Sequence, residues 1–234
     1  MNTVLRASSV RSFHETPNKW YDQHILGLDK FEGNTSTYLG TVVHKFAEAF
    51  YSLEEWSPYD ILEDAPDWVD KEIVLTEYKG MCDALEEKYL RHNKRELLEH
   101  YMNVDIGEYR FQGTCDAYDK GVLIDYKTSA SPKKKIDDYL QQLNIYAYLM
   151  ELTGREVHTL RAVNIVRATK RIPPRVNVLE CKADPAEGKR LIEFMIKKAK
   201  LAIENPEFRE LIFSPNQYSF LSDGFNIETD LKEL

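Results

Sequence analysis

The chain has 234 residues, of which 43% are hydrophobic, and a formal net charge of −8 at pH 7. This length allows one sizeable core, most simply a single α/β domain over residues 1–234. No run of about eighteen apolar residues occurs, so the sequence predicts no membrane span. The acidic balance argues against a general nucleic-acid binder, because phosphate affinity comes mainly from Lys and Arg.

The cysteine content and the first residues indicate where the protein acts. Cys82, Cys115 and Cys181 are odd in number and widely spaced, which suits reduced thiols and not a disulfide framework or a zinc site. Arg6 and Arg11 interrupt the N-terminal segment, so it lacks the apolar region of a secretory signal. We therefore expect a cytoplasmic protein, in the host cytoplasm if it is phage-encoded.

Residues 37–56 have the periodicity of an amphipathic helix, with Leu39 and Val43 on one face. His44 and Glu48 are four residues apart and therefore lie together on a neighbouring face. A lone histidine on such a helix more often has a structural role, and a carboxylate there is usually solvated. Other motifs are needed to decide whether His44 is a metal ligand.

Residues 57–96 are polar and acidic, and they predict a loop followed by helices. We interpret them as a helical insertion that either covers one side of a groove or packs on the surface. Residues 97–104 can form a strand, with Glu99 directed toward the site of the strands that follow.

Residues 111–128 predict two strands joined by a tight turn at Gly121, which tolerates a positive φ angle. The second strand begins with an apolar run and then carries Asp125 and Lys127. These side chains share a face because they are two residues apart. The preceding strand can bring Asp116 alongside. Burying two carboxylates and a lysine is costly without a purpose such as metal binding; the alternative is a structural Asp–Lys pair at a sheet edge.

A loop after this hairpin contains Lys133, Lys134 and Lys135, which either hold phosphates beside a metal site or are solvated. Residues 136–152 then predict a helix with a buried apolar stripe. On that helix Gln142 and Tyr146 are four residues apart and can interact.

Residues 159–166 and 175–179 predict a further pair of strands. Their connection is basic, and it is either a contact to the DNA backbone or a solvated turn; its cations include Arg167, Lys170 and Arg171. An amphipathic helix over residues 186–205 precedes the tail, residues 206–234.

Four short motifs occur in a definite order: residues 40–48 around His44, Gly113-x-x-Asp116, Asp125-Tyr126-Lys127 and Gln142-x-x-x-Tyr146. Together they resemble the RecB-like branch of the PD-(D/E)XK nuclease superfamily, and the chain is similar to CRISPR-associated RecB-like exonucleases. Each motif is weak alone, and the ordered set is the strong signal. The resemblance implies a central mixed β-sheet flanked by helices, with a restriction-endonuclease-like core.

The resemblance also implies the activity and the site. We expect a divalent-metal-dependent DNA nuclease, most simply an exonuclease of recombination, repair or phage DNA metabolism. Mg²⁺ or Mn²⁺ would be bound by His44, Asp116, Asp125 and the backbone carbonyl of Tyr126. Lys127 would orient the attacking water and stabilise negative charge, so Lys127, Asp116 and Asp125 are the expected catalytic residues. The expected supporting residues are Gln142, Tyr146, Glu48 and Glu99.

Iron–sulfur members of the family have a cysteine before the proline of the opening segment and three more near the C-terminus. Here Thr16 precedes Pro17, and residues 206–234 contain no cysteine. Because a cluster needs about four thiolates, we expect no iron–sulfur cluster. We expect the tail to pack near the N-terminus.

DNA, as single strands or duplex ends, is the expected partner. Two alternatives stay open. As alternatives to a nuclease, the chain is a catalytically silent DNA-binding module, or it is an interaction subunit of a helicase or a CRISPR adaptation complex. The intact set of Asp116, Asp125 and Lys127 argues against the first of these.

Overall fold

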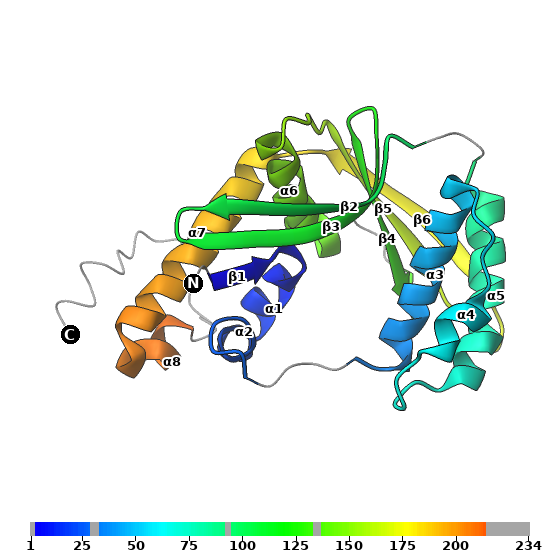
Figure 1. The fold of residues 1–234 in the computed structure, drawn as a ribbon, viewed down its shortest axis with the longest axis horizontal. Coiled ribbons are helices and arrows are strands. Elements are labelled where there is room, and N and C mark those ends of the chain that lie inside the picture. The colour runs from blue at the N-terminus through cyan, green and yellow to red at the C-terminus, as the bar shows by residue number, and fades with distance from the viewer. Residues whose placement is uncertain (1–2, 29–32, 92–94, 133–136, 214–234) are drawn as a thin grey trace.

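The computed structural model describes residues 3–28, 33–91, 95–132 and 137–213. Its strands form one six-stranded sheet in the order β1-β3-β4-β5-β6, with β2 paired to β3 outside this path. Parallel and antiparallel pairs both occur, so the predicted mixed sheet is confirmed (Figure 1). The strands are β1 (Thr3–Arg6), β2 (Leu97–Ile106), β3 (Tyr109–Asp119), β4 (Val122–Ser129), β5 (Thr159–Val166) and β6 (Arg175–Lys182).

Helices cover both faces of the sheet. Leu123 of β4 and Leu160 of β5 pack into one core with α6 and α7. Ile124 of β4 and Val163 of β5 point to the other face and pack into a second core with α3 and α5. This alternation follows from the two-residue period of a strand whose two faces are both buried. The helices are α1 (Val10–Glu15), α2 (Pro17–His24), α3 (Thr35–Ser52), α4 (Pro58–Glu63), α5 (Lys71–Lys88), α6 (Asp137–Leu152), α7 (Pro185–Glu204) and α8 (Arg209–Ile212), with 3₁₀ turns at Ala7–Ser9 and Pro206–Phe208.

Side chains that accept hydrogen bonds fix where the long helices begin. At α3, the Asn34 side chain accepts the Thr37 N–H at 3.0 Å, and the Thr37 hydroxyl accepts the Asn34 N–H at 2.8 Å. Asp70 and Asp184 cap α5 and α7 in the same way, each accepting an N–H three residues later. These caps satisfy N–H groups that have no partner within the helix.

The turn between β3 and β4 has positive φ angles at Lys120 (49°) and Gly121 (80°). Two positive φ values in a two-residue connection match the twist of a β-hairpin. The predicted turn is therefore confirmed. It brings the start of β4 beside the end of β3, where Ala117 pairs with Ile124.

The sheet has a gap along one edge of β3. Residues 109–112 of that edge pair with β1, and residues 117–119 pair with β4. Between them, residues 113–116 have no strand partner on this edge in the described part of the chain. β4 pairs with β5 along its whole length on its other edge, but its pairing with β3 stops at Ile124, so β3 and β4 diverge beyond the Ala117–Ile124 pair. The gap leaves room for side chains at the level of the sheet.

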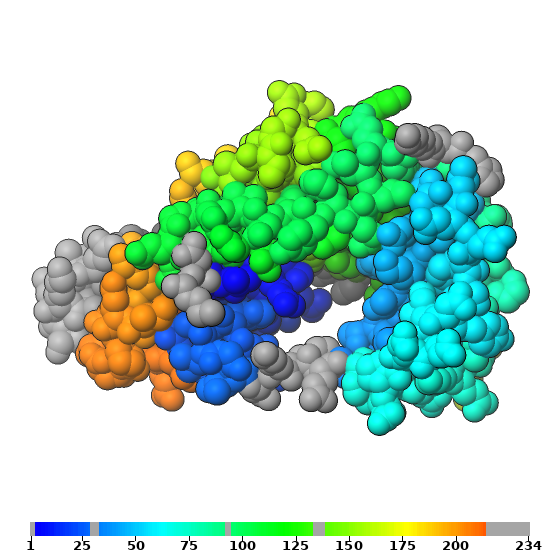
Figure 2. Space-filling model, in the orientation of Figure 1, coloured from blue at the N-terminus to red at the C-terminus, as the bar shows by residue number. Residues whose placement is uncertain are grey.

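The C-terminal end of β4 points into the space between α1 and α3 (Figure 1). Figure 2 shows that the surface is hollowed here, between the helices α1 and α2 and the helices α3 to α5. The gap in the sheet and this hollow together position the candidate site.

Residues 57–91 contain α4 and α5. Val74, Met81 and Leu85 of α5 are fully buried in the same core as Val163 of β5. This helix therefore forms part of the layer that covers the sheet. None of the described helices combines the length and the apolar character that a membrane span requires.

The described part of the tail contacts the N-terminal helices. The ring of Phe213 lies 6.1 Å from that of Trp20 and 5.2 Å from that of Tyr21, measured between ring centroids. Arg209 forms an ion pair with Asp22 at 3.0 Å. Residues 214–234, the rest of the predicted tail, lie outside the described residues.

Candidate active site

Asp116 lies where β3 and β4 diverge, and it is buried. Its Oδ2 accepts a hydrogen bond from the Tyr126 backbone N–H at 2.5 Å. Its Oδ1 lies 3.3 Å from His44 Nδ1 on α3. The carboxylate thus takes the place of a backbone acceptor that β3 no longer offers to β4. Because the N–H and C=O of one strand residue point to the same side, the Tyr126 carbonyl is also directed toward this gap.

Lys127 and Asp125 form a close pair on one face of β4. The Lys127 ammonium donates a hydrogen bond to Asp125 Oδ1 at 3.0 Å and lies 2.9 Å from Oδ2. Burial alone would lower the pKa of Lys127, but the nearby charges of Asp125 and Asp116 outweigh it, so this pKa is raised. Lys127 is therefore a fixed cation at neutral pH. It can position a water and stabilise negative charge, but it is not suited to accept a proton.

Glu99 has an unusual backbone. Its φ angle is 44°, and the β2–β3 ladder passes from Leu98–Ala117 to His100–Cys115 without pairing it. A non-glycine residue in this region is uncommon, and such strain costs roughly 1–3 kcal/mol, typically at functional sites. The distortion brings the Glu99 carboxylate to the His44–Asp116 pair.

His44, Glu99 and Asp116 each offer one ligand atom, and these atoms all lie within 4.8 Å of one another. We refer to these three residues as the metal triad. Without a cation, Asp116 holds the pKa of His44 above its ordinary value although burial opposes this. A divalent ion can replace that proton, because metal ligands must be deprotonated. One imidazole and two carboxylates are a donor set that suits Mg²⁺ or Mn²⁺.

Asp125 is not a member of the metal triad in the structure. Its Oδ2 is nevertheless buried, and the Lys127 ammonium lies 2.9 Å from it without forming a hydrogen bond of good geometry. Burial raises the pKa of this carboxyl although Lys127 opposes the shift. A carboxylate offers about four acceptor sites and Lys127 occupies only part of them, so Asp125 fits the predicted ligand set together with the Tyr126 carbonyl.

Gln142 and Tyr146 are brought to the other side of the site by α6. The Gln142 side-chain amide donates a hydrogen bond to the Tyr146 hydroxyl at 2.9 Å. The Tyr146 ring packs against Gly113, where a Cβ atom would come within 2.4 Å of Cε1. The glycine of the Gly113-x-x-Asp116 motif is therefore required for the close approach of Tyr146.

Glu48 lies outside the metal triad. Its carboxylate forms an ion pair with Lys45 at 2.5 Å on the surface of α3. The i,i+4 spacing to His44 thus places Glu48 next to the site without including it in the triad.

The basic residues predicted to bind DNA differ in their surroundings. Arg167 donates a hydrogen bond to the Ser36 carbonyl at 3.2 Å and lies 3.6 Å from Glu77, so it connects α3 and α5. Lys170 and Arg171 are exposed on the β5–β6 connection. The predicted phosphate-binding residues Lys133, Lys134 and Lys135 lie outside the described residues.

Asn164 is a site residue that the sequence interpretation missed. It is fully buried on β5, and its side-chain amide donates hydrogen bonds to the Lys127 carbonyl at 3.2 Å and to the Ser129 hydroxyl at 2.9 Å. It thereby holds the end of β4 that carries Lys127. The available signal was an amide within the otherwise apolar run Ala162–Val166, since a buried polar side chain needs partners.

The model of the PD-(D/E)XK nuclease superfamily matches residues 5–211. The chain belongs to this superfamily. Its members are nucleases, and the predicted superfamily is confirmed. The RecB-like branch and the relationship to CRISPR-associated exonucleases remain predictions. No curated protein matches the chain.

Solved structures of low sequence identity share the fold. A Eubacterium rectale protein assigned as an exonuclease has a TM-score of 0.57 at 13% identity, over 92% of this chain and 83% of its own. SSO0001 has a TM-score of 0.39 at 18% identity, over 84% and 77%. LHK-Exo in complex with dAMP has a TM-score of 0.35 at 13% identity, over 76% and 100%. The first of these similarities supports the fold that the superfamily assignment implies for this chain.

Replacing Glu99 is expected to have opposite effects on stability and on metal binding. Burial, and then the nearby Asp116, raise the pKa of Glu99 from 4.5 to about 7. The folded state is therefore destabilised as this carboxyl ionises, increasingly from pH 4.5 to about 7 and fully above that. At pH 8 in EDTA, Glu99→Gln should raise the free energy of unfolding by about 1 kcal/mol, after allowance for solvent screening.

The same substitution removes a ligand, so Mn²⁺ should raise the melting temperature of Glu99→Gln less than that of the wild type. Thermal unfolding in EDTA and in Mn²⁺ measures both effects. Glu48→Gln is the matched control, because Glu48 is paired with Lys45 and lies outside the triad. An unchanged response of Glu99→Gln to Mn²⁺ would remove Glu99 from the ligand set.

Proposed function

We propose that this chain is a divalent-metal-dependent deoxyribonuclease that acts as an exonuclease on DNA ends or single strands. The observation that carries the proposal is the convergence of the metal triad with the Asp125–Lys127 pair at the gap in the sheet. Four separate segments supply these residues. A structural Asp–Lys pair would not need a strained Glu99 or a histidine from α3 beside it.

A bound Mg²⁺ or Mn²⁺ would activate a water molecule and neutralise charge on the scissile phosphate. The protein's own residues orient the reactants. Asp116 fixes the His44 ring and the Tyr126 backbone, so the ligands are held before a substrate arrives. Lys127 directs its ammonium to the same region, where it orients the attacking water and stabilises the charge that develops on the phosphate.

Exonuclease action is supported by the confined cleft beside Lys127 and by the fold shared with the assigned Eubacterium rectale exonuclease. We place the enzyme in DNA recombination, repair or phage DNA metabolism, in the cytoplasm, where its cysteines remain reduced thiols. Two of them, Cys82 and Cys115, are buried, and burial raises the pKa of each thiol to about 12. A recombination or CRISPR protein is the proposed partner class.

The test is cleavage of end-labelled single-stranded and double-stranded DNA by the purified protein. We expect degradation in Mg²⁺ or Mn²⁺, no degradation in EDTA, and recovery when excess metal is added back. Short products that accumulate from the start of the reaction indicate exonuclease action. Binding of DNA without cleavage in either metal would contradict the proposal and favour a silent DNA-binding module.

A further inference from the structure

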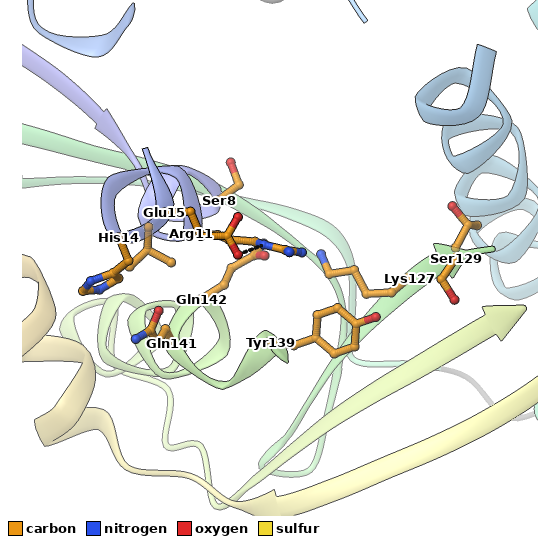
Figure 3. A pocket seen from close by; sticks show the side chains of 11 residues that line it. Ser8, Arg11, His14, Glu15, Lys127, Ser129, Tyr139, Gln141 and Gln142 are labelled. Carbon is orange, nitrogen blue, oxygen red and sulfur yellow. Dashed lines mark hydrogen bonds and ion pairs between the residues drawn. The ribbon is translucent and has the colours of Figure 1, made fainter. Parts of the chain in front are cut away.

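A cleft lies between α1 and α6 and extends to the end of β4 (Figure 3). Its volume is about 490 Å³. Lys127 and Ser129 line one end, and Figure 3 shows His14 and Gln141 at the other. Other polar residues that line it include Ser8, Arg11, Glu15 and Gln142.

The cleft adjoins the proposed reaction centre on one side only. Lys127 lines it, whereas none of the three metal-triad residues does. His44 belongs to α3, which covers the opposite face of the sheet from α6. A phosphate held at Lys127 therefore has the metal triad to one side and this cleft to the other.

Two cations enter the cleft from opposite walls. Figure 3 shows the side chains of Arg11 and Lys127 pointing toward each other. Arg11 is paired with Glu15 at 2.8 Å, and Lys127 is paired with Asp125 at 2.9 Å. Two facing cations repel unless an anion lies between them. A guanidinium can bind two phosphate oxygens at once, so a phosphate group suits this position.

The rest of the lining suits a sugar and a base. Tyr139 offers an aromatic surface, and Gln141 offers an exposed amide. Burial, and then Lys198, lower the pKa of His14, so its imidazole is neutral at physiological pH and adds no further charge. The volume falls within the range of small-molecule sites, about 300–1,000 Å³, and is far too small for a duplex.

We propose that this cleft is a subsite for one terminal nucleotide of a single DNA strand, with Arg11 binding its phosphate. The inference rests on the proposed nuclease function and makes it more specific. A subsite that holds one nucleotide beside the cleaved bond sets the size of the product. The enzyme then removes nucleotides singly from a strand end.

The test is equilibrium binding of thymidine 5′-monophosphate and thymidine 3′-monophosphate to the full chain in EDTA, so that a metal ion cannot hold the phosphate. Thymidine and inorganic phosphate are the comparison ligands. We expect at least one monophosphate to bind more tightly than either comparison ligand. Arg11→Ala should weaken this binding about ten-fold or more, because hydrogen bonds to charged groups are the strong ones.

Arg190→Ala is the matched control. Arg190 is also a helix-surface arginine paired with a glutamate, and its side chain is 62% exposed, compared with 63% for Arg11. It lies outside the cleft, so Arg190→Ala should bind as the wild type does. Both arginine–glutamate pairs are exposed, so neither substitution should prevent folding.

Equal binding by Arg11→Ala and the wild type would overturn the subsite, as would inorganic phosphate binding as tightly as the nucleotides. The result is separable from the nuclease assay. Arg11-dependent binding without metal-dependent cleavage would overturn the proposed function and keep the subsite. Cleavage without Arg11-dependent binding would overturn the subsite alone.

Discussion

Lys127→Ala is expected to lower the rate of metal-dependent DNA cleavage about a hundred- to a thousand-fold while the protein still binds Mn²⁺. The ammonium is the fixed cation beside the metal triad, and removing one such preorganised group commonly costs about 10²–10³ in rate. Lys127 is not a metal ligand, so its loss should leave the rise in melting temperature caused by Mn²⁺ intact.

Asp116→Asn tests the metal-binding part of the site. The asparagine side chain can still accept the Tyr126 N–H, which keeps the connection between β3 and β4. It loses the charge that holds His44 and binds a cation, so both cleavage and the effect of Mn²⁺ on melting should disappear.

Lys79→Ala is the control for both variants. It removes an exposed lysine that is paired with Asp83 on α5, and it should leave cleavage and the melting temperature unchanged. Single-turnover cleavage and thermal unfolding in EDTA and Mn²⁺ provide the measurements. Cleavage by Lys127→Ala at the wild-type rate would mean that the pair with Asp125 is structural.

Gly188→Ala should destabilise the whole domain. A Cβ atom at Gly188 of α7 would lie 2.0 Å from the backbone oxygen of Asn144 on α6, and no side-chain rotation relieves a clash with backbone. We expect a loss of about 3 kcal/mol or more, which lowers the melting temperature by about 10 °C in a chain of this size. The Asn144 side chain also accepts the Asp184 N–H, so separation of the helices would loosen the start of α7 as well.

Gly80→Ala on α5 is the comparison. Its nearest obstacle is the ring carbon Cγ of Pro174 at 3.1 Å, which can move slightly, and alanine favours the helix over glycine by about 1 kcal/mol. Urea denaturation measures the stability of both variants relative to the wild type. If Gly188→Ala unfolds at the same urea concentration as the wild type, the close packing of α6 on α7 is wrong.

Local sequence patterns predicted the parts of the fold that depend on neighbouring residues. The hairpin around Gly121 follows from strand alternation and a residue that tolerates positive φ, and the helix that carries His44 follows from its apolar period. The order of the four motifs then indicated the superfamily. These features required no knowledge of distant pairing.

The gap in the sheet could not be predicted in this way. It depends on β1 pairing with β3, two segments separated by most of the first half of the chain. The strained φ of Glu99 is likewise set by tertiary contacts, because a glutamate has no local preference for that conformation. The sequence therefore suggested Glu99 as a supporting residue, whereas the structure brings it into the metal triad.

The role of a charged surface residue could not be predicted from sequence either, as Arg11 and Arg167 show. Both are arginines in polar stretches, and composition does not distinguish them. The structure directs Arg11 into the cleft beside Lys127, whereas Arg167 is engaged by Ser36 and Glu77. A charge becomes informative about ligand binding only when its neighbours in space are known.

The central claim is that His44, Glu99 and Asp116 bind one divalent ion beside Lys127. An anomalous difference map from crystals grown with Mn²⁺ tests it most directly. We predict a peak in contact with all three side chains, and the loss of that peak in crystals of Asp116→Asn. The account would be contradicted if crystals at saturating Mn²⁺ showed no peak between these three side chains, whether or not Mn²⁺ was bound elsewhere.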